Sequence, residues 1–150
     1  MSTMLKISEA ASLALHSMVA LAADPDESIA NRELASRLHA SEAHLSKVLQ
    51  RLAKSGLVRS IRGPNGGFML GKPPDEISLL DVYESIDGRL VPSGCLFNAP
   101  IWDGGNCILG GLLEVVDKQT REYLARTKLN GVTGCVQEIK NTDVQKDNQH

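Results

Sequence analysis

The chain has 150 residues, of which 42% are hydrophobic and 23% are charged, and its net charge is −2. That length suits one domain, or a small domain with an appendage, and either buries a core without disulfides. The three cysteines are an odd number, and the first residues lack the apolar run of a secretory signal. We therefore expect a protein of the reducing cytoplasm with no membrane role.

Charge is divided unevenly along the chain. Residues 28–72 carry eight Lys or Arg against two Asp or Glu, a balance of +6, whereas residues 73–150 carry seven against twelve, a balance of −5. A net negative chain argues against a nucleic-acid partner, but the local distribution matters more than the total. The sequence thus predicts a basic segment followed by an acidic one.

Helical patterns fill the first third of the chain. Residues 8–23, rich in Ala and Leu, open on a serine cap and stop at Asp24-Pro25. Asn31 is predicted to cap a second, short helix, and Ser41 to cap a third that ends at Gly56. The third helix repeats apolar residues at helical spacing: Leu45, Val48, Leu49 and Leu52.

The middle of the chain predicts a hairpin and then two further helices. Residues 57–73 (LVRSIRGPNGGFMLGKP) place two short apolar strands around a Gly-rich turn. Residues 78–86 form a capped amphipathic helix, and residues 107–128 form the longest helical pattern. Its apolar stripe, which so small a chain leaves uncovered, consists of Ile108, Leu112, Val115, Val116, Tyr123 and Leu124. The polar tail after Gly134 is predicted to be flexible.

Three helices and a hairpin match the plan of a winged helix-turn-helix, in which the helix after the turn enters the major groove. The fold class predicted is therefore mainly α with a small β-hairpin wing. Arginines flank the wing turn, and its glycines allow close approach to a phosphate. The candidate DNA contacts are Ser41, Glu42, His44, Ser46, Lys47, Gln50, Arg51, Arg59, Arg62, Gly63, Pro64, Asn65, Gly66 and Gly67. The basic helix or the Gly-rich turn alone would fit a solvated surface. Their occurrence together in one segment of charge +6 favours a nucleic-acid partner.

The wing sequence RGPNGGFMLG, preceded by ASEAHLSKVLQRLAKSG and followed by ISLLDVYESIDG, resembles a family of dimeric bacterial regulators. That family includes IscR, NsrR, RsrR and CymR, and the resemblance covers about residues 5–130. It implies a DNA-binding transcriptional regulator, usually a repressor, that dimerises through the long C-terminal helix. It implies a two-fold-symmetric site in double-stranded DNA. The divisions it implies are a DNA-binding domain over 1–74, a sensor loop and dimerisation helix over 75–130, and a tail over 131–150.

Two cysteines bracket the sequence CLFNAPIWDGGNC before the last helix. Many members of this family hold an iron–sulfur cluster there, and a glycine-rich loop gives backbone N–H groups access to the cluster sulfurs. Members with three clustered cysteines carry the middle one where this chain has Ile101 and Trp102. The resemblance therefore leaves Cys95 and Cys107 as only part of a ligand set.

Three hypotheses for these thiols stay open. In the first, Cys95 and Cys107 bind a 2Fe-2S cluster together with His16 of the partner's first helix, because LALHSMV resembles the first helix of the RsrR-type member. The carboxylate that accompanies that histidine falls on Ser12, so a fourth ligand is unassigned, and Glu9 lies about two turns from His16. Without the resemblance, His16 would be interpreted as a core histidine.

In the second hypothesis the thiols sense oxidation without a metal, as the resemblance to the CymR branch allows. In the third they are small buried hydrophobes. Cys135 is interpreted as a bystander in the polar tail.

Two other classes of function are weaker. The sequence has no Ser-His-Asp order, Walker loop or HExxH motif, so we do not expect an enzyme. A protein-interaction module could use the same winged fold without DNA. The charge balance of residues 28–72 argues against that alternative.

Overall fold

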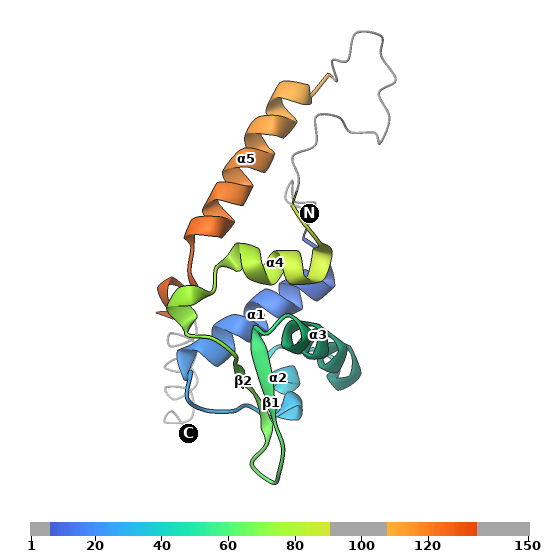
Figure 1. Cartoon of the computed structure of the whole chain (residues 1–150). Helices are drawn as coiled ribbons and strands as arrows, with labels where there is room; N and C mark the ends of the chain where they lie inside the picture. Colours follow the sequence, from blue (N-terminus) through green and yellow to red (C-terminus); the bar gives the residue numbers. More distant parts are fainter. Residues whose placement is uncertain (1–6, 91–107, 135–150) are drawn as a thin grey trace, which may run out of the picture.

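The computed structural model describes residues 7–90 and 108–134. Cys95, Cys107 and Cys135 lie outside these residues. In chain order the elements are α1 (Glu9–Ala23), α2 (Asn31–Arg37), α3 (Glu42–Lys54), β1 (Val58–Ile61), β2 (Gly67–Leu70), the 3₁₀ turn η1 (Pro74–Glu76), α4 (Leu79–Asp87), α5 (Gly110–Arg126) and η2 (Leu129–Gly131). The predicted class, mainly α with a two-stranded antiparallel hairpin, is confirmed (Figure 1).

Serine side chains begin three of the helices, as predicted. The hydroxyl of Ser8 accepts a hydrogen bond from the backbone N–H of Ala11 at 3.0 Å, and Ser41 accepts one from His44 at 3.0 Å. Ser78 forms a reciprocal capping box with Asp81, each side chain bonding the other's backbone N–H at 3.0 Å. These bonds satisfy amide groups that have no partner within the first turn.

The predicted cap of α2 is wrong. The residue before the helix is Ala30, which makes no side-chain cap, and Asn31 is the first helical residue. The Asn31 amide instead donates to the backbone carbonyl of Glu42 at 3.0 Å. Asn31 therefore joins the start of α2 to the start of α3, which fixes the turn between the two helices.

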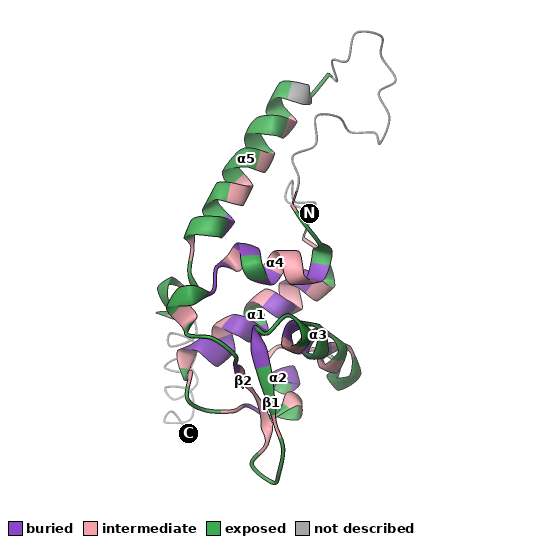
Figure 2. Ribbon diagram, in the orientation of Figure 1, coloured by how far each residue is buried: buried purple, intermediate pink, exposed green. Residues whose placement is uncertain are grey.

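One hydrophobic core joins the elements from α1 to η2. The helix α1 packs against α3, α4, β2 and η2, and Figure 2 shows it as the most buried helix. The described core residues with no solvent exposure are Ala11, Ala14, Met18, Leu21, Leu34, Leu45, Leu49, Leu52, Ile77, Val82 and Leu129. Because α4 shares this core with α1 and α3, its position is set by its packing against these two helices.

The hairpin is attached to the loop before α2. Ile29 forms a β-bridge with Phe68, with backbone hydrogen bonds of 2.9 Å in both directions. This close approach explains Gly67 of the wing, by which we mean β1, β2 and their turn, and a close approach within the turn explains Gly66. A Cβ on Gly67 would lie 2.3 Å from the Ile29 carbonyl oxygen, and one on Gly66 would lie 2.3 Å from that of Ile61. Contacts within the protein therefore exclude a side chain at both positions.

The C-terminal helix is attached by its carboxyl-terminal end. Leu124 is buried, and the chain just after the helix bonds the start of α4 through Leu79 N–H to Thr127 O at 2.9 Å and Leu129 N–H to Ile77 O at 3.0 Å. The 17 residues of α5 span about 26 Å. Figure 1 shows the helix extending away from the body of the protein.

Most of the predicted stripe on this helix is uncovered. Ile108 is 80% exposed, and Leu112, Val115 and Tyr123 are each at least 50% exposed. Only Leu124 of the stripe is buried by the chain itself. Uncovered apolar residues at helical spacing are typical of a surface that meets a partner.

The variant Gly67→Ala is expected to destabilise the fold, because only movement of the backbone relieves the contact between its Cβ and the Ile29 carbonyl. We expect the free energy of unfolding in urea to fall by about 1–3 kcal/mol. Gly131→Ala is the matched control, since nothing lies within 4 Å of its added Cβ. Equal stability of the two variants would contradict this description of the wing.

Candidate nucleic-acid interface

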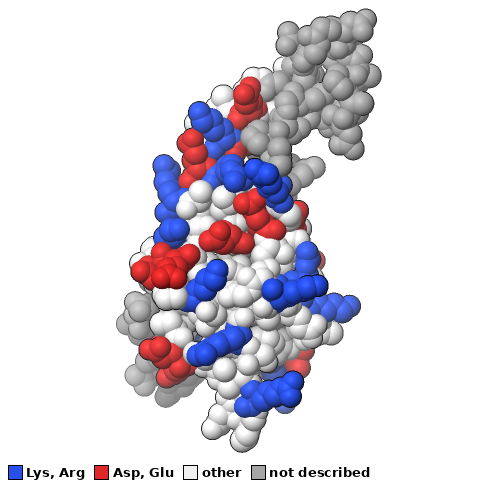
Figure 3. All heavy atoms as spheres, viewed as in Figure 1, with Lys and Arg blue, Asp and Glu red and all other residues white. Residues whose placement is uncertain are grey.

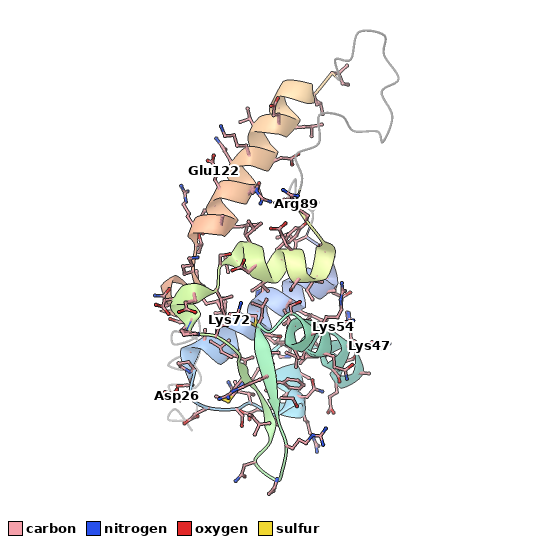
Figure 4. All side chains as sticks on the ribbon, in the orientation of Figure 1. Asp26, Lys47, Lys54, Lys72, Arg89 and Glu122 are labelled. Carbon is pink, nitrogen blue, oxygen red and sulfur yellow. The ribbon has the colours of Figure 1, made fainter. Side chains whose placement is uncertain are left out.

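The outward face of α3 is polar because its inward face is occupied by the core. Leu45, Leu49 and Leu52 are fully buried and Val48 is 2% exposed. At 3.6 residues per turn, the residues between them point the other way. The predicted contacts exposed there are Ser41, Glu42, Lys47, Gln50 and Arg51, and those half-buried are His44 and Ser46. Figure 4 shows Lys47 and Lys54 projecting from this helix.

Lys47 is an exposed cation on this face and is available to a phosphate. It makes no ion pair with any residue in the described part of the chain, whereas Glu42 faces Arg32 at 4.0 Å. Gln50 donates to the hydroxyl of Ser46 at 3.4 Å, so these two side chains form one polar unit. The centre of α3 therefore offers a cation beside amide and hydroxyl groups, the chemistry that reads phosphates and base edges.

The wing tip is held from within and faces outward. Gly66 N–H donates to the Gly63 carbonyl at 2.9 Å, and the Ser28 hydroxyl donates to the carbonyl of Asn65 at 3.0 Å. Arg59, Arg62, Gly63, Pro64 and Asn65 are exposed, while Gly66 and Gly67 are half-buried. A turn fixed by these bonds presents Arg62 without a large loss of backbone freedom on binding.

Arg51 lies apart from the other candidates. Its guanidinium Nη2 donates to the backbone carbonyl oxygen of Ile86, close to the end of α4. The sequence grouped Arg51 with the DNA contacts because its position faces outward on α3. The structure brings its charged group to a neighbouring helix instead.

Arg32 is a candidate that the sequence analysis missed. It lies in the first turn of α2, and its side chain is 88% exposed. Its ion pair with Glu42 spans 4.0 Å, and a pair so exposed contributes little. The +6 balance of residues 28–72 already included this charge, but no local motif marked it.

Basic side chains dominate the surface over α3 and the wing. Figure 3 shows blue Lys and Arg groups across the lower centre and right of the molecule, with red Asp and Glu groups at the lower left and nearer α4 and α5. In the described residues no helix is long and apolar enough to cross a membrane.

His16, the predicted cluster ligand on α1, is exposed, so it is not the core histidine that its apolar neighbours suggest. Its ring Nδ1 lies 2.7 Å from the carbonyl oxygen of Ser12. A carbonyl oxygen only accepts, so this bond requires the proton on Nδ1, and in the neutral ring the lone pair is then on Nε2. Within residues 7–90 and 108–134 no three His, Cys, Asp or Glu side chains gather as a metal site.

An exposed recognition helix, a basic surface and a hairpin wing define a winged helix-turn-helix DNA-binding protein. Residues 7–134 match the Rrf2 family, which is described as iron-dependent transcriptional regulators. The chain therefore belongs to the Rrf2 family and is a transcriptional regulator, not an enzyme.

Relatives in this family have the same fold. The chain is 28% identical over 116 residues to the HTH-type transcriptional regulator IscR of Photorhabdus laumondii, which covers 77% of this chain and 70% of that protein. The structure of CymR, the global cysteine regulator of B. subtilis, is similar at a TM-score of 0.75 and 27% identity, over 87% of this chain and 98% of that one. T. potens IscR is similar at a TM-score of 0.70 and 25% identity, over 91% of each chain.

The variant Arg62→Ala is expected to weaken DNA binding without unfolding the protein, because Arg62 is exposed at the tip of the wing. A gel shift on the protein's own promoter, repeated over a range of salt, measures the loss. Lys128→Ala removes an equal charge beyond α5 and is the control. An unchanged affinity in Arg62→Ala would show that the wing does not contact DNA.

Proposed function

We propose that this protein is a dimeric repressor that binds a two-fold-symmetric site in double-stranded DNA. We propose further that the redox or iron–sulfur state of the loop containing Cys95 and Cys107 switches its binding. The observation that carries the DNA-binding part is the joint exposure of the outward face of α3 and of the wing tip, in a segment of eight cations and two anions. Neutralising phosphates supplies most of the affinity of such a surface. The protein would act in the cytoplasm, where its DNA lies.

A second copy of the chain is the partner that suits α5. The uncovered residues of its stripe lie at helical spacing and extend from the body, so the same stripe on two copies can pair about a two-fold axis. That pairing would place one recognition helix and one wing on each half-site. The proposed division of the chain follows: a DNA-binding part over 1–74, a sensing and dimerising part over 75–130, and a tail over 131–150.

Leu112→Glu is expected to convert the dimer to monomers, because it places a charge within the uncovered stripe. Analytical ultracentrifugation measures the change, and circular dichroism checks that the helices remain. Ala125→Glu adds the same charge at an exposed position on the opposite face of α5 and should stay dimeric. A dimeric Leu112→Glu protein would contradict the proposed interface.

His16 fits the role of a cluster ligand supplied to the partner subunit. Its Nδ1 lies 2.7 Å from the Ser12 carbonyl oxygen, and this bond would orient the ring and leave Nε2 as the ligand atom. When bound, an iron–sulfur cluster supplies a one-electron redox change whose potential depends on its ligands and hydrogen bonds. Cys95 and Cys107 would provide thiolates from a loop that the described residues do not include. Glu9 is on the same helix as His16 and is exposed, so it could supply the unassigned ligand.

Protein purified without oxygen is expected to be coloured and to contain iron and sulfide. Cys95→Ala and Cys107→Ala should lose the cluster, and His16→Ala should change its visible spectrum and redox behaviour. Cys135→Ala is the control and should match the unchanged protein. Iron binding that survives loss of Cys95 and Cys107 would remove both from the site, and an unchanged spectrum would remove His16.

A cluster-free switch of the CymR type is the second candidate, favoured by the similarity to the B. subtilis CymR structure. The Staphylococcus aureus CymR oxidized form is also similar, at a TM-score of 0.69 and 25% identity, over 86% of this chain. In this alternative Cys95 and Cys107 respond to oxidation directly or a partner protein controls binding. Colourless protein that cannot take up a cluster, yet loses or gains DNA affinity on thiol oxidation, would favour it.

A further inference from the structure

Arg51 joins the recognition helix to the end of α4. Its guanidinium donates to the carbonyl oxygen of Ile86, the penultimate residue of α4. The last carbonyls of a helix have no partner within it and carry partial negative charge, so a cation bonded there is favourable. Because the donor is charged, the bond is stronger than one between neutral groups. Arg51 therefore ties α3 to α4, a helix that packs against both α1 and α3.

Arg51 also lies far from the end of α3 that reads bases. Helix-turn-helix proteins contact base edges with the first residues of the recognition helix. Arg51 is nine residues after Glu42, the first residue of α3, and therefore about 14 Å further along the axis. Arg51 thus lies further from that end than Lys47 does, and unlike Lys47 its charged group bonds a backbone carbonyl of another helix.

Other parts of the chain bond the same end of α4, which we call the α4 junction (Glu84, Ile86, Asp87 and Leu90). The hydroxyl of Ser8, the cap of α1, donates to the Asp87 carboxylate at 2.6 Å. Leu90 N–H donates to the carboxylate of Glu84 at 2.9 Å. Burial, and next the negative charges of Asp87 and Glu84, raise the pKa of Tyr83 beside the junction.

The long helix α5 contacts this junction through one arginine. Arg121 Nη1 donates to the Leu90 carbonyl at 2.7 Å and lies 3.7 Å from the Glu84 carboxylate. Its side chain is 37% exposed and that of Glu84 is 25% exposed, so water screens this pair less than it screens a fully exposed one. Arg51 and Arg121 thus approach the two sides of one short segment, one from the DNA-reading helix and one from α5.

We propose that Arg51 is a positioning residue that sets the recognition helix against the α4 junction, and that Arg121 acts on α3 through the same junction. A shift of α5 would move Leu90 and Glu84, and through Ile86 it would move the guanidinium that holds α3. Both arginines would then change DNA affinity without contacting DNA. The inference rests on the established DNA-binding class, and it does not depend on a cluster or on the cysteines.

The salt dependence of DNA binding separates a positioning residue from a phosphate contact. A plot of log K against log salt has a negative slope, and each lost phosphate contact reduces its steepness by about 0.9. One substitution removes two such contacts from a dimer. We expect Arg51→Ala to weaken binding about five- to tenfold, and Arg51→Gln, which keeps amide donors without the charge, to weaken it less. The slope should stay unchanged in both, because neither variant loses a phosphate contact. Lys47→Ala should make the slope less steep. A slope that becomes less steep in Arg51→Gln as it does in Lys47→Ala would overturn the proposal, and so would full affinity in Arg51→Ala.

Coupling through the junction is measured with the double variant. If both arginines act on α3 through the same segment, Arg51→Ala and Arg121→Ala together should weaken binding no more than the stronger single variant does. Lys118→Ala, a charge removed from an exposed site of α5, should leave affinity unchanged. The coupling would be overturned if the fold-losses of affinity of the two single variants multiplied in the double variant. Sedimentation must first show that each variant has the same oligomeric state as the unchanged protein.

The two proposals fail in distinguishable ways. If the unchanged protein bound no DNA at low salt, the DNA-binding function itself would fail before any variant was compared. If it bound DNA and the Arg51 variants matched it, only the positioning role would fail. Thermal unfolding of each variant shows whether a weaker affinity reflects loss of the fold.

Discussion

The apolar face of α3 is the constraint on which the rest of the structure depends. Leu45, Leu49 and Leu52 are buried in the core that α3 shares with α1, α2 and α4, and helical geometry then fixes which residues point outward. That packing gives Lys47 and Gln50 their direction, and it places the amino-terminal end of α3 next to α2. The wing is placed by a second attachment, the bridge between Ile29 and Phe68. Both parts of the DNA-binding surface are therefore positioned by contacts on the side away from DNA.

The same core extends from the DNA-binding elements to the base of α5. Leu129 and Leu124 anchor the end of that helix, while its other end extends away with its apolar residues uncovered. A helix attached at one end acts as a lever, because a small rotation at the anchor becomes a larger displacement at the far end. The proposed sensor loop lies between Leu90, which follows α4, and Ile108, which precedes α5. Bonds from Arg121 to Leu90 and Glu84 connect this lever to the core.

Local signals in the sequence predicted the elements well. Serine caps at Ser8, Ser41 and Ser78, the leucine spacing of α3 and the Gly-rich turn each depend on residues a few positions apart. Contacts between distant residues were not predictable in the same way. Asn31 resembles a cap but bonds Glu42, and Arg51 faces outward on its helix but bonds Ile86. Gly67 was interpreted as access for a phosphate, whereas its constraint comes from Ile29, almost forty residues earlier. The exposure of His16 likewise depends on packing that its apolar neighbours do not reveal.

The central claim is that two copies of this basic surface, held together by α5, read one symmetric site. Hydroxyl-radical footprinting of the protein on a DNA fragment selected by binding tests it most directly. The account predicts two protected blocks related by a two-fold axis, with centres separated by a whole number of helical turns of about 10 base pairs each. A single protected block, or protection with no symmetry, would contradict it.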